Sequence, residues 1–427
     1  MIRKLSYSFI LFLFIYAVPF KTIPLNSGKL SLIFVFLFLL FISTFRAISI
    51  PREVKRLFLI FSPLLILGIF LSTIRAMLTD SFQFDLAYSF TITLLESLFG
   101  VLVFIVLAYN LKMGEKDVIK SLIGVMVFQA LIILVSMNFE MLRELIFSVS
   151  RFEDSHRGIY NRYGGFRGLG LSGQVTYDLS VNLSLSVMLI GYLIFKSNQL
   201  DILVNWYVVI IITVLMTSVI SVTGRTGLIG IIMALFLYLF YFISISFTKK
   251  LIHLMIITVL LIAFIGLISI DLDSRLLNRI YDYVFEFYIN SVSDGGVSTE
   301  STTLLWQMIT TPMSSETMLY GDGYWLDTES NKFYYKNVDS GYIRHILFYG
   351  MPLTLIIFTV FVCQFLYISL YKVNLNYITL LFLSLLVMYF LIAEIKGDFI
   401  FGSGMNMKVL YIIVFSIYLK SKREALA

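Results

Sequence analysis

The chain has 427 residues, of which 59% are hydrophobic and only 14% are charged, and its mean hydropathy is +0.92. A soluble domain does not need this much apolar surface, so the soluble globular classes are excluded. The formal net charge of +6 does not indicate nucleic-acid binding, because the basic residues lie in short hydrophilic gaps between apolar runs. The single cysteine, Cys363, excludes an intramolecular disulfide and a thiolate metal cluster.

The apolar runs predict an all-α integral membrane protein. A bilayer core of about 30 Å requires about 20 mostly apolar residues in a helix, and about twelve segments meet that length. We treat the chain, 1–427, as one polytopic membrane domain. The expected spans lie near 5–22, 30–50, 57–75, 88–109, 118–137, 174–195, 203–222, 226–247, 251–270, 346–370, 376–395 and 404–420.

Lys and Arg in the short connections predict the orientation of the chain. Their alternation places both termini in the cytoplasm. The two longest hydrophilic intervals, 138–173 and 271–343, then fall on the outer side, which is the periplasm of a Gram-negative cell. The basic sets that define this orientation lie at 3–4, 46–56, 112–120, 249–250 and 420–423.

The first outer loop is rich in arginine, against the usual distribution of positive charge. It reads RFEDSHRGIYNRYGGFRGLGLSGQ and contains Arg157, Arg162 and Arg167 among many glycines. Guanidinium groups bind phosphate bidentately, and glycine lets a ligand approach the main chain. The loop is therefore a candidate cradle for pyrophosphate. Contact between these arginines and anionic lipid headgroups explains the same residues equally well.

A further arginine lies in SVTGRTGLIG, where almost nothing separates two apolar spans. A tight turn explains Gly224 and Gly227 without a function. Arg225 is less expected on the outer side, where positive charge is usually scarce. We therefore interpret Arg225 as a functional candidate.

The second outer loop combines an amphipathic run with an aromatic, acidic segment. The run from Ser274 to Asn290 has helical spacing of its apolar residues and is expected to lie along the membrane surface. Downstream, Tyr324, Trp325 and Tyr342 alternate with acids and amides, a combination that suits the apolar face and hydroxyl rim of a sugar ring. An interfacial aromatic belt is the alternative.

This loop ends in DSGYIRHILFYG, at the start of an apolar span. A charge within the hydrocarbon costs about 3 kcal/mol or more, so Asp339, Arg344 and His345 are expected to pair, to snorkel or to take part in chemistry. Simple anchoring of a helix at the interface is the alternative. Glu96 and Asp178 lie inside predicted spans and are weaker candidates, as relay or structural groups.

Together these features resemble the O-antigen polymerase (Wzy) family, to which the O-antigen ligases are close relatives. The resemblance covers the predicted topology, the arginine and glycine loop, the Gly-Arg-Thr-Gly turn and the loop ending GDGYW…DSGYIRHILFYG. A loop pattern of that family, an arginine followed after ten residues by glycine, is met by Arg157 with Gly168 and by Arg162 with Gly173.

The resemblance implies a GT-C-like architecture and a metal-independent glycosyltransferase without a cofactor. The donor would be a growing glycan on undecaprenyl pyrophosphate, and the acceptor one repeat unit on the same lipid. Membrane lipids and a chain-length regulator are the other expected partners. On this interpretation Arg157, Arg162, Arg167 and Arg225 bind pyrophosphate, and Tyr324, Trp325 and Tyr342 bind the glycan. The catalytic group consists of Arg344, His345 as first candidate for orienting or deprotonating the acceptor hydroxyl, and Asp339 as second.

Two other functions fit the same sequence. An O-antigen ligase would transfer the finished glycan to lipid A core from the same donor. A flippase or other transporter of lipid-linked oligosaccharides would form no bond, and would be expected to have charges at mid-membrane and short outer loops. The long outer loop and its charges favour an enzyme.

Overall fold

The computed structural model describes residues 2–79, 81–151, 153–162, 170–174, 177–197, 206–244, 286, 300–327, 334–371 and 377–419. Within these residues the fold is helical, and the only β-type pairings are the isolated bridges Phe20–Ser150 and Leu326–Tyr334.

In the described part of the chain the helices follow one another in order, with one π-helix, η1, and two short 3-10 helices, η3 and η4. Their bounds are α1 Ile2–Tyr16, α2 Ser27–Phe45, α3 Arg52–Leu78, α4 Asp85–Ile92, η1 Thr93–Phe99, α5 Gly100–Asn110, α6 Glu115–Asn138, α7 Glu140–Val149, α8 Glu153–Arg162, α9 Tyr177–Ser197, α10 Trp206–Thr223, η3 Arg225–Gly227, α11 Leu228–Ser244, α14 Glu300–Ile309, α15 Ser315–Tyr320, η4 Tyr335–Asn337, α16 Gly341–Tyr349, α17 Met351–Tyr371, α18 Tyr377–Ala393 and α19 Gly404–Ile417.

Six helical stretches among the described residues are long and apolar enough to cross a membrane, which confirms the all-α class and a multi-pass membrane protein. The number of about twelve spans stays a prediction. The expected span at 251–270 lies outside the described residues, as does the amphipathic run apart from Glu286. The six stretches are Ser27–Phe45, Arg52–Leu78, Asp85–Asn110, Glu115–Asn138, Tyr177–Lys196 and Met351–Leu370.

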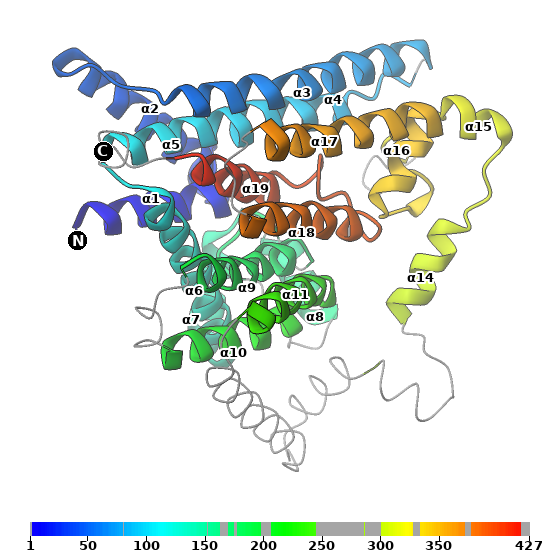
Figure 1. Cartoon of the computed structure of the whole chain (residues 1–427). Helices are drawn as coiled ribbons and strands as arrows, with labels where there is room; N and C mark the ends of the chain where they lie inside the picture. Colours follow the sequence, from blue (N-terminus) through cyan, green and yellow to red (C-terminus); the bar gives the residue numbers. More distant parts are fainter. Residues whose placement is uncertain are drawn as a thin grey trace.

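Helix α19 lies at the centre of the bundle. It packs against α1, η1, α5, α6 and α9, and every residue from Met405 to Ile417 is buried. Figure 1 shows α3, α4, α5 and α17 running side by side above it, and α6, α9, α10 and α11 grouped below. A helix that is apolar all round is expected to occupy such a core position.

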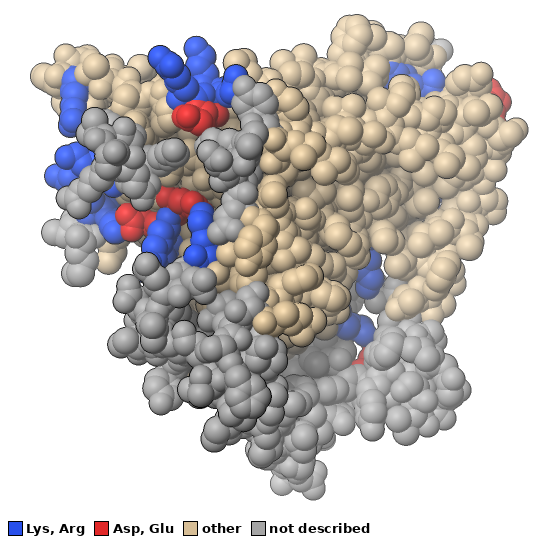
Figure 2. Space-filling model, viewed as in Figure 1, with Lys and Arg blue, Asp and Glu red and all other residues tan. Residues whose placement is uncertain are grey.

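The loops and helix ends gather into two opposite ends of the bundle. At the end that we call the site end, Arg75 at the end of α3 donates to the carbonyl of Phe348 at the end of α16. At the opposite end, Lys196 pairs with Glu115 at 2.6 Å. In Figure 2 the visible Lys and Arg gather mainly at the left, the end at which Figure 1 marks the N-terminus. The predicted orientation, with both termini in the cytoplasm and the site end on the outer side, stays a prediction.

The boundaries of one expected span and one expected loop differ from those in the structure. The expected span 346–370 is divided at Gly350, whose φ of +85° ends α16 before α17 begins. A side chain at position 350 would lie 2.8 Å from the nitrogen of Tyr320, so glycine is required there for space as well as for conformation. The expected outer loop 138–173 contains the helices α7 and α8, because its polar stretches are interrupted by amphipathic turns.

The membrane stretch Asp85–Asn110 is not a regular α-helix. Between α4 and α5 the chain forms the π-helix η1, over Thr93–Phe99. One-turn π segments within α-helices occur frequently at functional sites. Here the π segment carries Glu96, the only charged residue of η1.

Candidate functional site

The guanidinium of Arg344 lies between two aromatic rings at the site end. Its Cζ is 3.9 Å from the ring centre of Trp325 and 3.6 Å from that of Tyr334, and the residue is only 6% exposed. Both rings come from the loop that precedes α16, whereas Arg344 lies on α16 itself. Stacking of a desolvated guanidinium on aromatic faces contributes about 2 kcal/mol or more. The contact therefore fixes the loop against the helix.

His345 is fully buried behind Arg344. Its ring packs against Trp325, Phe358 and Phe401, at centre distances of 5.3, 5.5 and 5.6 Å. The Nε2 atom lies 3.8 Å from Oδ1 of Asp398, which is an ion-pair distance rather than a hydrogen bond. The His345 ring therefore lies among aromatic side chains and next to Asp398.

We call Arg344, His345 and the side chains around them the arginine–histidine cluster. The loop between α18 and α19, residues 394–403, supplies two buried acids to this cluster. Asp398 Oδ1 accepts the N–H of Gly402 at 2.9 Å, and its Oδ2 lies 3.8 Å from Nη1 of Arg344. Glu394 Oε2 accepts the N–H groups of Phe399 and Ile400 at 2.8 and 2.9 Å. Each carboxylate is thus held through one oxygen by backbone N–H groups, which leaves its other oxygen toward the cluster.

The two acids differ in protonation. Burial alone would favour the neutral form of Asp398, but the charges of His345 and Arg344, with the N–H of Gly402, lower its pKa to about 2. Burial, followed by the charge of Asp398, raises the pKa of Glu394 well above its usual value. Two neighbouring carboxylates of this kind share one proton, with Asp398 charged and Glu394 neutral.

His345, Glu394 and Asp398 are also the described residues that could hold a metal ion. Their ligand atoms all lie within 4.8 Å of one another. Several of these atoms, His345 Nδ1 and Nε2, Glu394 Oε1 and Asp398 Oδ2, make no hydrogen bond within the described residues. A divalent cation would satisfy them, and a proton shared by the carboxyl groups neutralises part of the same charge. The sequence prediction of a metal-independent site stays a prediction.

The other predicted site residues near Arg344 differ in their exposure to solvent. Asp339 is exposed at the entrance to the cluster; partial burial raises its pKa, and the charge of Arg344 acts in the opposite direction. Tyr324 is partly exposed and packs on Tyr335, with ring centres 5.3 Å apart. Tyr342 donates its hydroxyl to the carbonyl of Leu391. Trp325 is 5% exposed and covered by Arg344, whereas Tyr324 and Tyr342 are each partly exposed, and the predicted glycan-binding role of the three residues stays a prediction.

Two of the arginines predicted to bind pyrophosphate, Arg157 and Arg225, pair with acids of the chain. Arg157 on α8 pairs with Glu144 of α7 at 2.7 Å, and Arg225 pairs with Glu286 at 2.6 Å. The side chain of Arg162 and all of Arg167 lie outside the described residues. Their predicted role stays a prediction, and in this arrangement Arg157 and Arg225 form ion pairs with acids of the chain.

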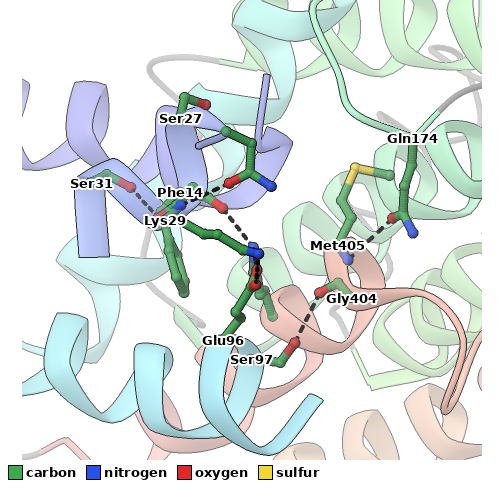
Figure 3. Close-up of polar contacts among 12 residues, drawn as sticks. Phe14, Ser27, Lys29, Ser31, Glu96, Ser97, Gln174, Gly404 and Met405 are labelled. Atoms are coloured by element: carbon green, nitrogen blue, oxygen red, sulfur yellow. Dashed lines mark hydrogen bonds and ion pairs between the residues drawn. The ribbon is translucent and has the colours of Figure 1, made fainter. Parts of the chain in front are cut away.

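A charged cavity adjoins the cluster at the same end of the bundle. Its volume is about 340 Å³, and its charged lining residues are Lys29, Glu96, Arg151 and Lys408. Figure 3 shows Lys29 of α2 and Glu96 of η1 facing one another, with Gln174 and Met405 nearby. The wall continues into the α18–α19 loop through Gly402, whose N–H also binds Asp398. The cavity and the arginine–histidine cluster therefore share one loop.

The sequence did not indicate the residues that complete the arginine–histidine cluster and the charged cavity. Glu394 and Asp398 lie about fifty residues after His345, and the signal available was a pair of acids at the end of a span. Lys408 had a clearer signal, because it is the single charged residue of an otherwise uncharged apolar helix. The sequence indicates Glu96 only as a relay or structural group.

Comparison with known proteins adds no relative: no family model matches the chain, and neither the curated proteins nor the solved structures contain a match. The chemistry of the site is therefore what indicates the function.

Proposed function

We propose that the protein is an O-antigen polymerase of the bacterial inner membrane, with a GT-C-like architecture and the site end in the periplasm. It would transfer a growing glycan from undecaprenyl pyrophosphate to a sugar hydroxyl of a new lipid-linked repeat unit. The observation that carries this proposal is the α18–α19 loop, which contributes Asp398 to the arginine–histidine cluster and Gly402 to the charged cavity. Cations and acids thus meet at one end of a membrane bundle, where lipid headgroups lie.

The reaction needs little more than positioning and charge. The acceptor hydroxyl attacks the anomeric carbon of the donor, the bond from that carbon to the pyrophosphate oxygen breaks, and undecaprenyl pyrophosphate leaves. The proton of the hydroxyl passes to a base. Pre-positioned cations stabilise the charge that develops on the leaving oxygens, a contribution of about 3 kcal/mol for each essential group.

The burial of His345 changes the order of the two candidate bases. Asp339 is exposed, and its raised pKa makes it a better proton acceptor than an ordinary carboxylate. His345 is enclosed and lies beside Asp398, so it acts on Arg344 and the loop rather than on substrate. We therefore assign proton acceptance to Asp339, and we assign His345 a positioning role.

The test is the length of surface polysaccharide, seen as a gel ladder, after deletion of the gene and after its restoration with variants. The polymerase proposal expects the deletion to leave core with one repeat unit, and expects Arg344→Ala and Asp339→Asn to fail to restore the ladder at normal expression. The control is Lys196→Gln, which removes a half-buried cation from its pair with Glu115 at the opposite end and should restore the ladder.

Two other results of the deletion would indicate a different function. Loss of all glycan from the core, with polymer accumulating on undecaprenyl pyrophosphate, would make the protein a ligase. Accumulation of single lipid-linked units on the cytoplasmic face would make it a flippase.

A further inference from the structure

Lys408 is a buried cation with unused hydrogen-bonding capacity. It is 3% exposed, and its Nζ donates to the carbonyl of Phe14 at 3.0 Å. The nearest carboxylate oxygen, on Glu96, is 3.9 Å away, beyond hydrogen-bond distance. An ammonium group has three donors, and a buried charge is costly unless it is paired. Lys408 Nζ therefore lies at the edge of the cavity with donors left for a ligand.

Glu96 is shared between two lysines. Its carboxylate lies 3.2 Å from Lys29 Nζ and 3.9 Å from Lys408 Nζ. The charged lining of the cavity is three cations, Lys29, Arg151 and Lys408, and one acid, so the net charge is +2. A cavity of about 340 Å³ falls within the range of small-molecule sites, which is about 300–1,000 Å³. This cavity suits an anion of about two charges.

An apolar, exposed surface follows Lys29, which lines the cavity. On α2, Ile33 and Phe36 follow Lys29 by about one and two turns on the same face, and they are 47% and 42% exposed. Phe36 packs against Phe99 of η1, with ring centres 6.3 Å apart. An apolar chain lying along this surface would have its polar end at Lys29. The site thus fits an anion attached to a lipid better than a free anion.

We propose that the cavity binds the phosphate or pyrophosphate headgroup of a polyprenyl lipid between Lys29 and Lys408, and that Glu96 occupies the place of the headgroup until the lipid displaces it. This binding site is separate from the arginine–histidine cluster. The identity of the lipid as a substrate rests on the proposed function, whereas binding of the headgroup does not. A transferase with two lipid-linked substrates needs two such sites, one on each side of the α18–α19 loop.

The experiment measures binding to the purified full-length protein in nanodiscs. The probes are farnesyl pyrophosphate and inorganic pyrophosphate, which carry the same anion with and without an apolar tail. Lys29→Gln should weaken farnesyl pyrophosphate binding by about tenfold or more, because a hydrogen bond to a charged group is lost. Glu96→Gln should tighten it, because the internal competitor loses its charge.

Matched variants separate binding from folding. Lys4→Gln removes a more exposed lysine from its 2.5 Å pair with Asp117 at the opposite end, and it should leave binding unchanged. Lys408→Met is combined with Glu96→Gln, so that no buried acid is left without its partner. If this double variant keeps the thermal stability of Glu96→Gln and loses the probe, Lys408 is a ligand.

Three results would overturn the proposal: no binding of either probe, binding that Lys29→Gln and Glu96→Gln leave unchanged, or equal binding of both probes, which would make the ligand a free anion. Arg344→Ala distinguishes this inference from the proposed function. Binding that survives Arg344→Ala, together with a deletion that leaves the polysaccharide ladder intact, would retain the lipid site and reject the polymerase.

Discussion

Gly341 and Glu394 are in such close contact that position 341 has no room for a side chain. The N–H of Gly341 donates to the carbonyl of Glu394 at 3.0 Å. A Cβ at position 341 would lie 2.6 Å from Cδ of Glu394 and 2.9 Å from the carbonyl oxygen of Gly397. The start of α16 is thereby held against the end of α18, which brings His345 to Asp398.

The first prediction is that Gly341→Ala destabilises the protein by about 1–3 kcal/mol, the usual cost of overpacking a close contact. Thermal unfolding of the detergent-solubilised protein measures this. The control is Gly124→Ala on α6, where an added methyl meets nothing within 4 Å and helix propensity predicts a gain of up to about 1 kcal/mol. Equal behaviour of the two variants would contradict the observed packing.

The second prediction concerns the stacking of Arg344. Arg344→Lys keeps the positive charge near Asp398 but loses the planar contact with Trp325 and Tyr334, so we expect a loss of about 2 kcal/mol. Trp325 fluorescence should change together with the unfolding temperature. A variant as stable as the parent protein, with unchanged fluorescence, would show that charge alone is what the site requires.

The third prediction follows from the raised pKa of Glu394. Above the unfolded value near 4.5, the unfolded chain releases this proton while the folded chain retains it, so folding stability falls as pH rises toward the folded pKa. Glu394→Gln mimics the protonated acid and should remove this fall. Its stability relative to the parent should grow with pH, by at most about 1.4 kcal/mol per pH unit.

The same variant separates a proton from a metal ion in the cluster. If His345, Glu394 and Asp398 bound a divalent cation, Glu394→Gln would lose a ligand and would be destabilised at every pH at which the metal binds. Unfolding curves between pH 4 and 8, with and without a chelator, report the difference.

The fourth prediction concerns Arg75, which binds two helix ends at once. Its Nη2 donates to the carbonyl of Gly321 at 2.5 Å, after α15, and its Nε to the carbonyl of Phe348 at 3.3 Å, in the last turn of α16. Terminal carbonyls carry partial negative charge, so a cation is favoured there. Arg75→Gln should cost about 1.5–3 kcal/mol and loosen α16. Faster hydrogen exchange at 341–349, with no change in α9, is the measurement.

Much of the fold was predictable because it depends on long apolar runs. The stretches Arg52–Leu78 and Glu115–Asn138 are identified by length and composition alone, and the structure confirms both as helices able to span a membrane. The grouping of Arg344 with His345 was also accessible, since the two are adjacent in the sequence. The pairing of His345 with Asp398 was not, because it depends on how α16 packs against a loop about fifty residues later.

The remaining differences come from local backbone geometry that residue types do not encode. Nothing in TLLESLF distinguishes a π-helix from an α-helix, and the division at Gly350 is hidden inside a continuous apolar segment. The accessibility of the aromatic residues could not be predicted from residue types either. Trp325 is of a residue type that often binds sugars, but Arg344 covers its ring.

The π-helix η1 has a consequence for how this chain can vary. Each residue of an α-helix turns the chain by about 100°, and a π turn contains one residue more than an α turn. Deletion of a single residue from Thr93–Phe99 would restore a continuous α-helix in which Tyr88 and Ile92, which line the cavity, keep their direction relative to α5, but it would remove the wider turn that carries Glu96 to the cavity. In this stretch the length of the sequence is therefore as strict a requirement as its composition, and a one-residue gap would change the cavity more than most substitutions.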